Sequence, residues 1–313
     1  MSSGEKGTAA PIVITGIAGN LGQLLAKRLH TGHPIIGIDM RPFEGKPKDI
    51  QHFAIDVRKR KAEDIFRHNR IQALVHMGLV HRPSRRGRTH REMNVIGTQM
   101  LLEYCARYDV RKVVLMSSAY AYGAKAENSN FLTEDAPLQG GQDYPEERAL
   151  IEWDMHAQSF FWKHPEIETV ILRPVHVVGP TVRNAPSNYL RLHNPPMLLG
   201  FDPMIQLVHE EDLIQAILLS LQPGKRGVFN IVGPGEVPLS MAHKELRHTP
   251  VPLPHFLAKS VLKRLWRWGV VNFPPGELPH LQFQCMVDGT RAREELGFRP
   301  RYSLRSTIRS VVG

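Results

Sequence analysis

The segment IVITGIAGNLG at residues 12–22 constrains the fold of this chain more than any other stretch. It begins with four β-branched residues, which favour a buried strand, and it leads into helical periodicity at 21–30. Glycines stand at positions 16, 19 and 22. Glycine permits the tight turn and the close backbone approach that a strand needs when it passes directly into a helix. The segment therefore predicts the opening strand and helix of an α/β fold.

Apolar runs of strand length alternate with helical patterns through the first 180 residues. The runs are short, β-branched and bounded by turn residues, and they lie at 12–15, 35–39, 52–55, 73–76, 113–117 and 169–174. Helical periodicity occupies 21–30, 59–69, 89–108 and 145–162. Because parallel neighbouring strands need crossover connections, this alternation predicts a doubly wound parallel sheet with helices on both faces.

The glycine segment also predicts a site for a dinucleotide. The amides and the dipole at the start of a helix stabilise the charge of a pyrophosphate. The second strand ends in Asp39, about 20 residues after the glycines, where the dinucleotide fingerprint has an acidic residue. Asp39 would accept hydrogen bonds from the adenosine ribose and repel a 2′-phosphate, which favours NAD. Arg41 keeps NADP open, because its guanidinium could pair with that phosphate.

Asp56 ends the third strand and has two interpretations. It could receive the adenine amino group of the same dinucleotide. It could equally cap the helical segment that starts at Arg58. The sequence does not choose between them.

The pattern changes after Gly179, where five prolines between 180 and 203 interrupt it. Helical patterns follow at 210–221, 239–248, 255–268 and 290–296, with a strand at 227–232. We expect a flexible tail at 1–10 and a dinucleotide-binding Rossmann domain at 11–180. Residues 181–313 then form a smaller C-terminal substrate-binding lobe, with sheet-completing segments near 205–232.

The composition argues against several classes of protein and site. The contents of 42% hydrophobic and 22% charged residues are ordinary for a globular chain. Cys105 and Cys285 lack disulfide-framework and metal-ligand spacing, so we expect reduced cysteines and no metal site. The first ten residues lack a secretory signal pattern, and no apolar run reaches the roughly 18 to 20 residues that span a bilayer. We therefore expect a cytoplasmic protein.

The net charge of +10 fits anionic partners, and it fits a solvated surface equally well. No recognised nucleic-acid-binding motif accompanies the charge, so we expect no nucleic acid partner. Residues 81–91 hold five arginines, which could clamp a phosphorylated substrate or belong to a solvated loop. Residues 255–268 predict a basic amphipathic helix that covers a substrate pocket with its apolar face or, as the less favoured alternative, lies on an anionic membrane surface.

The chain resembles the extended short-chain dehydrogenase/reductase family, in its NAD-dependent epimerase/dehydratase group. The matching motifs occur in the family's order: TGxxGxxG at 15–22, Asp39, DV at 56–57, HMG at 76–78, NxxGT at 94–98, SSxxxYG at 117–123, YxxxR at 144–148, LRP at 172–174, GP at 179–180 and VHxxD at 208–212. A further match, DxxRxxxxLGF, lies at 288–298. The resemblance thus covers nearly the whole chain.

The resemblance implies an oxidoreductase or epimerase that transfers hydride between a nicotinamide cofactor and a secondary alcohol or ketone carbon. Ser118 would hydrogen-bond the substrate oxygen, Tyr144 would exchange a proton with it, and Arg148 would hold the nicotinamide ribose. The residues implied to contact the cofactor are Gly16, Ala18, Gly19, Asn20, Leu21, Gly22, Asp39, Arg41, Asp56, Val57, Met77, Gly78, Asn94, Tyr144 and Arg148. Those implied to contact the substrate are Ser118, Ala119, Tyr120, His176 and Arg183. The resemblance also implies a homodimer through the helices at 89–108 and 145–162.

Arg148 departs from the family pattern, which has lysine there. A free phenol with a pKa of about 10 is a poor base at neutral pH, and a nearby cation favours the phenolate. Spacing of four residues places Tyr144 and Arg148 on one helix face. A guanidinium keeps the charge but is essentially never neutral, so it cannot join a proton relay by losing a proton. The alternative is therefore an NAD(P)-binding module that senses the cofactor or scaffolds partners without turnover.

His176 is a second departure. Nucleotide-sugar members of the family usually carry asparagine there, where it contacts the nucleotide diphosphate. Histidine can donate a hydrogen bond and can be cationic near neutrality, so diphosphate binding stays open. Relatives that oxidise steroids and lipid alcohols also lack the asparagine. The substrate is thus a nucleotide sugar or a lipid-like alcohol.

Overall fold

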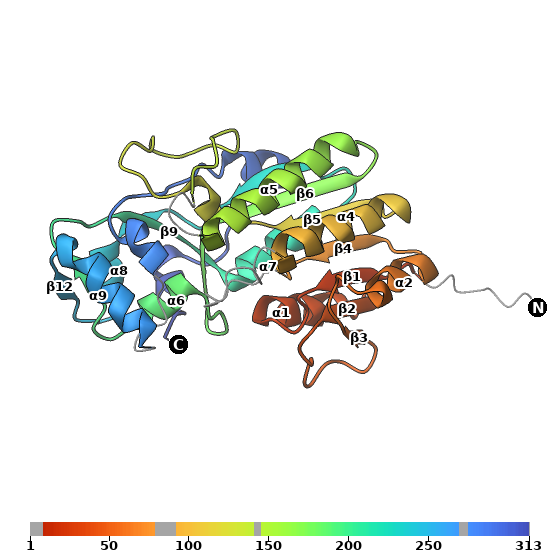
Figure 1. The fold of residues 1–313 in the computed structure, drawn as a ribbon, viewed down its shortest axis with the longest axis horizontal. Coiled ribbons are helices and arrows are strands. Elements are labelled where there is room, and N and C mark those ends of the chain that lie inside the picture. Colours follow the sequence, from red (N-terminus) through yellow and green to blue (C-terminus); the bar gives the residue numbers. More distant parts are fainter. Residues whose placement is uncertain (1–8, 79–91, 141–144, 269–274, 313) are drawn as a thin grey trace, which may run out of the picture.

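A seven-stranded parallel sheet forms the larger part of the molecule, on the right in Figure 1. The computed structural model describes residues 9–78, 92–140, 145–268 and 275–312. The strands are β1 (Ile12–Thr15), β2 (Ile35–Asp39), β3 (Gln51–Ala54), β4 (Ala73–His76), β5 (Lys112–Met116), β6 (Glu168–Pro174) and β10 (Gly227–Ile231). They lie in the order β10-β6-β5-β4-β1-β2-β3. The order changes direction between β1 and β4, and ligands bind beyond the carboxyl ends of strands at such a point.

Helices cover both faces of this sheet. On one face, α1 (Asn20–Leu29), α7 (Glu210–Ser220) and the π-helical turn η4 (Ala292–Leu296) share a buried apolar core with the strands. On the other face, α2 (Arg60–His68), α4 (Gly97–Arg107) and α5 (Pro145–Lys163) share a second core, in which Trp153 is fully buried. This arrangement confirms the predicted doubly wound α/β fold.

A smaller lobe lies at the other end of the molecule, on the left in Figure 1. Its strands are β7 (His176–Val178), β9 (Met204–His209) and β11 (Glu236–Pro238) in one sheet, with β8 (Pro196–Leu198) and β12 (Val251–Leu253) in another. Its helical elements are α6 (Ala185–Leu190), α8 (Leu239–Glu245), α9 (His255–Arg267), the 3₁₀ segment η3 (Pro275–Leu281) and α10 (Leu304–Arg309). A third buried cluster, which includes Tyr189, Ile205 and Leu262, forms the core of the lobe.

Most predicted elements of the large sheet are present, with small shifts at their ends. The helix predicted at 89–108 is described from Glu92, where a π-helical turn, η1 (Glu92–Ile96), precedes α4. The predicted sheet-completing segments near 205–232 separate, because β10 joins the large sheet and β9 joins the small one. The domain boundary at 180 stays a prediction.

A buried ion pair joins the large sheet to its helices and to the segment after β5. Arg173 on β6 contacts Asp154 on α5 through Nε at 2.9 Å and Nη2 at 2.6 Å, and both side chains are at most 1% exposed. Ser117 donates to the same carboxylate at 2.5 Å. Arg173 Nη1 donates to the Tyr122 hydroxyl at 2.8 Å, which donates in turn to Asn230 of β10 at 2.8 Å. Burial alone would lower the pKa of Arg173, but its hydrogen bonds with Asp154 outweigh burial and raise it.

Replacing Asp154 should therefore destabilise the protein strongly. Asp154→Asn leaves the buried guanidinium without a counter-charge, so we expect the free energy of unfolding to fall by about 3–5 kcal/mol. Urea denaturation followed by circular dichroism measures this. The control is Glu295→Gln, which removes an exposed ion pair with Arg291 at 3.2 Å and should cost less than about 1 kcal/mol. Equal losses in the two variants would contradict the prediction.

Candidate functional site

The glycine segment forms a tight loop against the end of β4. Gly16 has a φ of 75°, and a Cβ added there would lie 2.8 Å from the Cα of Gly78. A Cβ at Gly22 would collide with the carbonyl oxygen of Gly16. Side chains are therefore excluded at both positions, which lets the loop close between β1 and β4. Gly19 is the N-cap of α1 and provides no side-chain cap, so no capping side chain occupies the first amides of the helix.

Asp39 lies beside this loop, as the sequence predicts, and Arg41 is bound to it. The Asp39 carboxylate accepts the backbone N–H of Ala18 at 3.1 Å. Arg41 donates to it through Nε at 3.1 Å and Nη2 at 3.0 Å. Hydrogen bonding with Asp39 raises the pKa of Arg41. The guanidinium also borders the loop, because its Nη2 would lie 3.5 Å from a Cβ at Gly19.

Asp56 closes a turn with Arg58. Its carboxylate accepts the backbone N–H of Arg58 at 2.9 Å and the guanidinium at 2.6 Å, and these hydrogen bonds lower its pKa. It does not cap α2, whose N-cap is Lys59, so the helix-cap interpretation of Asp56 is wrong. The adenine contact stays a prediction. Val57 is packed beside α4, since a Cβ at Gly97 would lie 3.0 Å from its methyl group.

A chain of buried hydrogen bonds runs beneath the loop, and the sequence did not predict it. Thr15 contacts His76 Nδ1 at 2.5 Å, and His76 Nε2 contacts Thr98 at 2.8 Å. Thr98 donates to the carbonyl oxygen of Asn94 at 2.5 Å and accepts from the Trp153 indole at 2.7 Å. Because the Thr98 proton is committed to Asn94, His76 must carry its proton on Nε2 and accept from Thr15 on Nδ1. This chain fixes the ends of β1, β4 and α4 relative to one another.

Ser118 begins the 3₁₀ segment η2 (Ala119–Tyr122) after β5. Its Oγ accepts the backbone N–H of Tyr120 at 3.2 Å, which leaves the hydroxyl proton able to donate to another group. Arg148 lies exposed in the first part of α5, which packs against η2. Tyr144, the predicted proton donor, lies outside the described residues.

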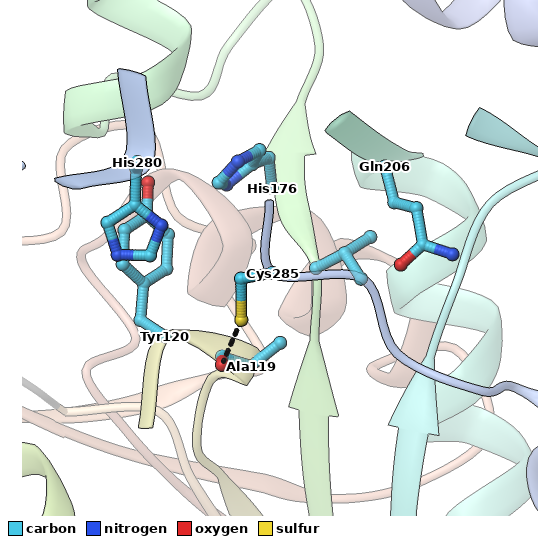
Figure 2. A pocket seen from close by; sticks show the side chains of 7 residues that line it. Ala119, Tyr120, His176, Gln206, His280 and Cys285 are labelled. Carbon is cyan, nitrogen blue, oxygen red and sulfur yellow. Dashed lines mark hydrogen bonds between the residues drawn. The ribbon is translucent and has the colours of Figure 1, made fainter. Parts of the chain in front are cut away.

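Two neighbouring cavities open beside η2. The first is lined by Ala119, Tyr120, Val175, His176, Gln206, His280 and Cys285. Figure 2 shows the Tyr120 and His280 rings side by side, with His176 opposite and Cys285 Sγ pointing to the Ala119 carbonyl oxygen. The second cavity shares Tyr120, His176 and His280 with the first. Three predicted substrate residues, Ala119, Tyr120 and His176, thus meet at one place.

Several lining residues were missed by sequence reasoning. Gln206, His280 and Cys285 come from the second half of the chain, where no motif marked them. Burial raises the pKa of the Cys285 thiol to about 12. Only the cavity itself identifies these three residues.

The other predicted residues occupy different places. Arg183 donates to the carbonyl oxygens of Pro180 at 2.8 Å and Val182 at 2.9 Å and does not line either cavity. Asn20 donates to the carbonyl oxygen of Thr181, which joins the start of α1 to the segment after β7. Leu21 and Met77 pack against the core of the sheet. The arginines at 82–91 lie outside the described residues.

The basic helix α9 has its apolar side turned inward. Ala258 and Leu262 are buried in the core of the lobe, whereas Phe256 and Trp268 are 71% and 69% exposed. No residue of α9 lines either cavity; the helix packs on η3, which does. Among the described residues, no helix is long and apolar enough to cross a membrane.

His209 stands directly before the acidic first turn of α7, which carries Glu210, Glu211 and Asp212. Its ring accepts the backbone N–H of Glu211 at 3.2 Å, as the N-cap of α7. The described part of the chain contains no group of three or more ligand side chains that could hold a metal ion.

Comparisons with known proteins identify the family of this chain. The model of the NAD dependent epimerase/dehydratase family matches residues 12–232. The chain belongs to this family. It is 28% identical over 306 residues to an uncharacterized protein of Mycobacterium tuberculosis, covering 93% of this chain and 80% of that one. It is 30% identical over 169 residues to the UDP-glucose 4-epimerase of Bacillus subtilis, covering 48% of this chain and 49% of that one.

Solved structures of the family share the fold. The UDP-glucose 4-epimerase of Thermotoga maritima, solved with UDP-glucose, has a TM-score of 0.77 at 21% identity, covering 96% of this chain and 97% of that one. The dTDP-glucose 4,6-dehydratase of Bacillus anthracis, solved with NAD, has a TM-score of 0.74 at 18% identity, covering 97% of this chain and 96% of that one. At these identities the likeness concerns the fold alone.

Four histidines of the protein are held neutral by their surroundings. Burial lowers the pKa of His76, His176 and His243 to about 4 and that of His280 to about 3. His243 is 0% exposed, and neither of its ring nitrogens has a hydrogen-bond partner among the described residues. Each of these rings therefore opposes protonation in the folded state.

The stability of the protein should consequently fall in mild acid. An unfolded histidine has a pKa of about 6.5, so between about pH 6.5 and 4 the unfolded chain binds more protons than the folded one. Above this window the buried histidines do not reduce the free energy of unfolding. Within it, each fully buried histidine lowers the free energy of unfolding by about 1.4 kcal/mol for each unit by which the pH falls. Urea unfolding midpoints measured from pH 8 to 4 test this. His243→Leu should reduce the slope of the unfolding midpoint against pH, whereas His255→Leu, at an exposed position, should leave that slope unchanged. Identical slopes in the two variants would contradict the conclusion that His243 opposes protonation in the folded state.

Proposed function

We propose that this protein binds NAD and transfers hydride at a secondary alcohol or ketone carbon. The observation that carries the proposal is the side-chain-free loop of Gly16 and Gly22 with the Asp39 carboxylate beside it. The strand β4 separates this loop from β5, after which Ser118 and the cavity residue Tyr120 follow. In this proposal the loop would hold a dinucleotide, and the substrate would lie near Ser118 and Tyr120. The solved relatives that hold NAD support the choice of cofactor.

The loop suits a dinucleotide in shape and in charge. With no side chain at positions 16 and 22, the amides of the loop and of α1 can approach a pyrophosphate. Asp39, whose side chain is 8% exposed, can accept hydrogen bonds from the adenosine ribose. Arg41 is engaged with that carboxylate, which favours NAD over NADP. NADP binding would require Arg41 to leave Asp39 and pair with the 2′-phosphate.

The residues that follow β5 would handle the substrate oxygen. Bound NAD would supply the hydride acceptor or donor. Ser118 would donate its hydroxyl proton to the oxygen, since its contact with the Tyr120 N–H uses a lone pair of Oγ and not that proton. Tyr144 would exchange the proton, and Arg148 would supply the positive charge that favours phenolate and would hold the ribose. The packing of α5 on η2 brings the helix that carries Arg148 to the segment that carries Ser118.

A homodimer through α4 and α5 is also part of the proposal. On α5, Met155 and Trp162 are 58% and 76% exposed, and Ile96 before α4 is 38% exposed. Large apolar side chains on adjacent helices are typical of an interface between subunits. Analytical ultracentrifugation would test it.

The cofactor preference should depend on the contact between Asp39 and Arg41. Asp39→Ala removes the ribose acceptor and releases Arg41, so we expect the NAD affinity to fall by about tenfold or more and the NADP affinity to rise. Isothermal titration calorimetry measures both. Asp64→Ala, which removes an exposed ion pair with Arg67 on α2, should change neither. An unchanged NAD affinity in Asp39→Ala would contradict the proposed cofactor site.

The role of Arg148 separates a catalyst from a binding module. We expect Arg148→Lys to preserve or raise turnover and Arg148→Met to lower kcat by about a hundredfold, because the latter removes the charge that favours phenolate. NADH formation from a panel of nucleotide sugars and secondary alcohols measures this, with Arg264→Met on α9 as the control. Undiminished NAD binding without turnover in every variant, the unmodified protein included, would favour the non-catalytic module.

A further inference from the structure

The outer side of α9 combines cations with apolar side chains. Ala258 and Leu262 are buried in the core of the lobe, and they fix which side of the helix faces inward. The side that faces away carries exposed residues in two adjacent rows at helical spacing: Phe256, Ser260, Lys263 and Arg267 in one row, and Leu257, Arg264 and Trp268 in the other. Charged and apolar groups thus share one exposed surface.

The apolar side chains of this surface are unusually exposed. Phe256, Leu257 and Trp268 are 71%, 45% and 69% exposed. Two further exposed apolar side chains, Leu199 and Val251, adjoin the start of the helix, because β8 and β12 pair directly before it. An exposed apolar patch with polar surroundings is typical of a contact with another protein or with a membrane.

The charged groups of this surface all have the same sign. Residues 246–276 hold five lysines and arginines and no acidic residue. Lys259, Lys263 and Arg264 are exposed and form no ion pair within the described part of the chain. Glu245, directly before this stretch, is already paired with two arginines of α10 at 2.8 and 2.6 Å. The surface is therefore complementary in charge to an anionic partner.

The combination of cations with exposed apolar side chains selects the kind of partner. A second copy of the chain, packed with the same surface, would bring like charges together. A nucleic acid would engage the cations and the rings, but it would leave the aliphatic side chains at 199, 251 and 257 in water. An anionic bilayer meets both requirements, because its headgroups attract lysine and arginine while its interface accepts phenylalanine and tryptophan rings.

We propose that the outer side of α9, together with Leu199 and Val251, docks this protein on an anionic lipid bilayer. The helix lies in the plane of the membrane, with Phe256 and Trp268 among the headgroups and its buried side still packed in the lobe. Figure 1 shows α9 at the end of the smaller lobe, away from the large sheet. The inference does not depend on the proposed function, because no residue of this surface lines the cavities beside η2.

Sedimentation with vesicles tests the docking. The full chain is mixed at low ionic strength with sucrose-loaded vesicles of phosphatidylcholine alone, or of equal parts phosphatidylcholine and phosphatidylglycerol. We expect binding to the anionic vesicles to exceed binding to the neutral ones by at least about a hundredfold, because each cation near the surface adds to the attraction. Salt at about 1 M, where the Debye length is about 3 Å, should release most of the protein. Equal binding to both kinds of vesicle, or binding to neither, overturns the proposal.

Removing the rings tests their insertion. Phe256→Ala combined with Trp268→Ala should weaken binding to the anionic vesicles by about tenfold or more. The control combines Phe53→Ala with Phe131→Ala, which removes two rings that are 39% and 42% exposed elsewhere on the protein, and it should leave binding unchanged. Unchanged vesicle binding in the α9 variant overturns the proposal. A lower mass of that variant in analytical ultracentrifugation, together with unchanged vesicle binding, would identify the surface as a contact between two copies of the chain.

Removing charge tests whether the cations of α9 act locally. Lys263→Gln combined with Arg264→Gln should weaken binding to the anionic vesicles by about thirtyfold. The control combines Arg60→Gln with Lys61→Gln on α2, which removes the same net charge from exposed positions and should have a much smaller effect. Equal losses in the two variants would mean that the net charge alone drives binding, and the proposal would be wrong. If far-ultraviolet circular dichroism shows that one α9 variant is unfolded, the other decides.

Discussion

The contact between Arg173 and Asp154 holds together the parts of the molecule on which its site depends. It joins β6 to α5, and through Ser117 and Tyr122 it reaches both ends of the segment that carries Ser118. A buried charge needs its partner and its hydrogen bonds, so this pair tolerates little movement. The segment between β5 and the cavity is therefore fixed by a network within the core. Arg148 is attached to the same frame, because α5 carries it six residues before Asp154.

The fold and the shape of the glycine loop could be predicted because their signals are local. Gly16 and Gly22 are required by contacts with residues close in the chain or in the adjacent strand, and Asp39 ends a strand whose pattern is clear. The cavity could not be predicted in the same way. His280 and Cys285 reach Tyr120 from more than 150 residues away, through η3 and a segment without periodicity. Strands of three residues, such as β7 and β8, also carry too little pattern to be found.

His176 and Arg148, the two departures from the family pattern, lie in different surroundings. His176 lies in a desolvated cavity, where its ring is neutral, so the cationic role that the sequence left open is not the one its surroundings favour. Arg148 is exposed in the first part of α5, and a guanidinium keeps the positive charge that a lysine would carry there. The charge at 148 is therefore kept while the proton chemistry of a lysine is lost.

The seventh strand has a consequence for how the chain matures. β10 pairs with β6 along its whole length, yet β7, α6, β8, β9 and α7 lie between the two strands in the sequence. Until residue 231 has been synthesised, β6 is an unpaired edge of apolar residues, which is a template for intermolecular pairing. During synthesis the edge at β6 therefore stays unpaired until β10 has been made. Chaperones that shield exposed strand edges would act during this period.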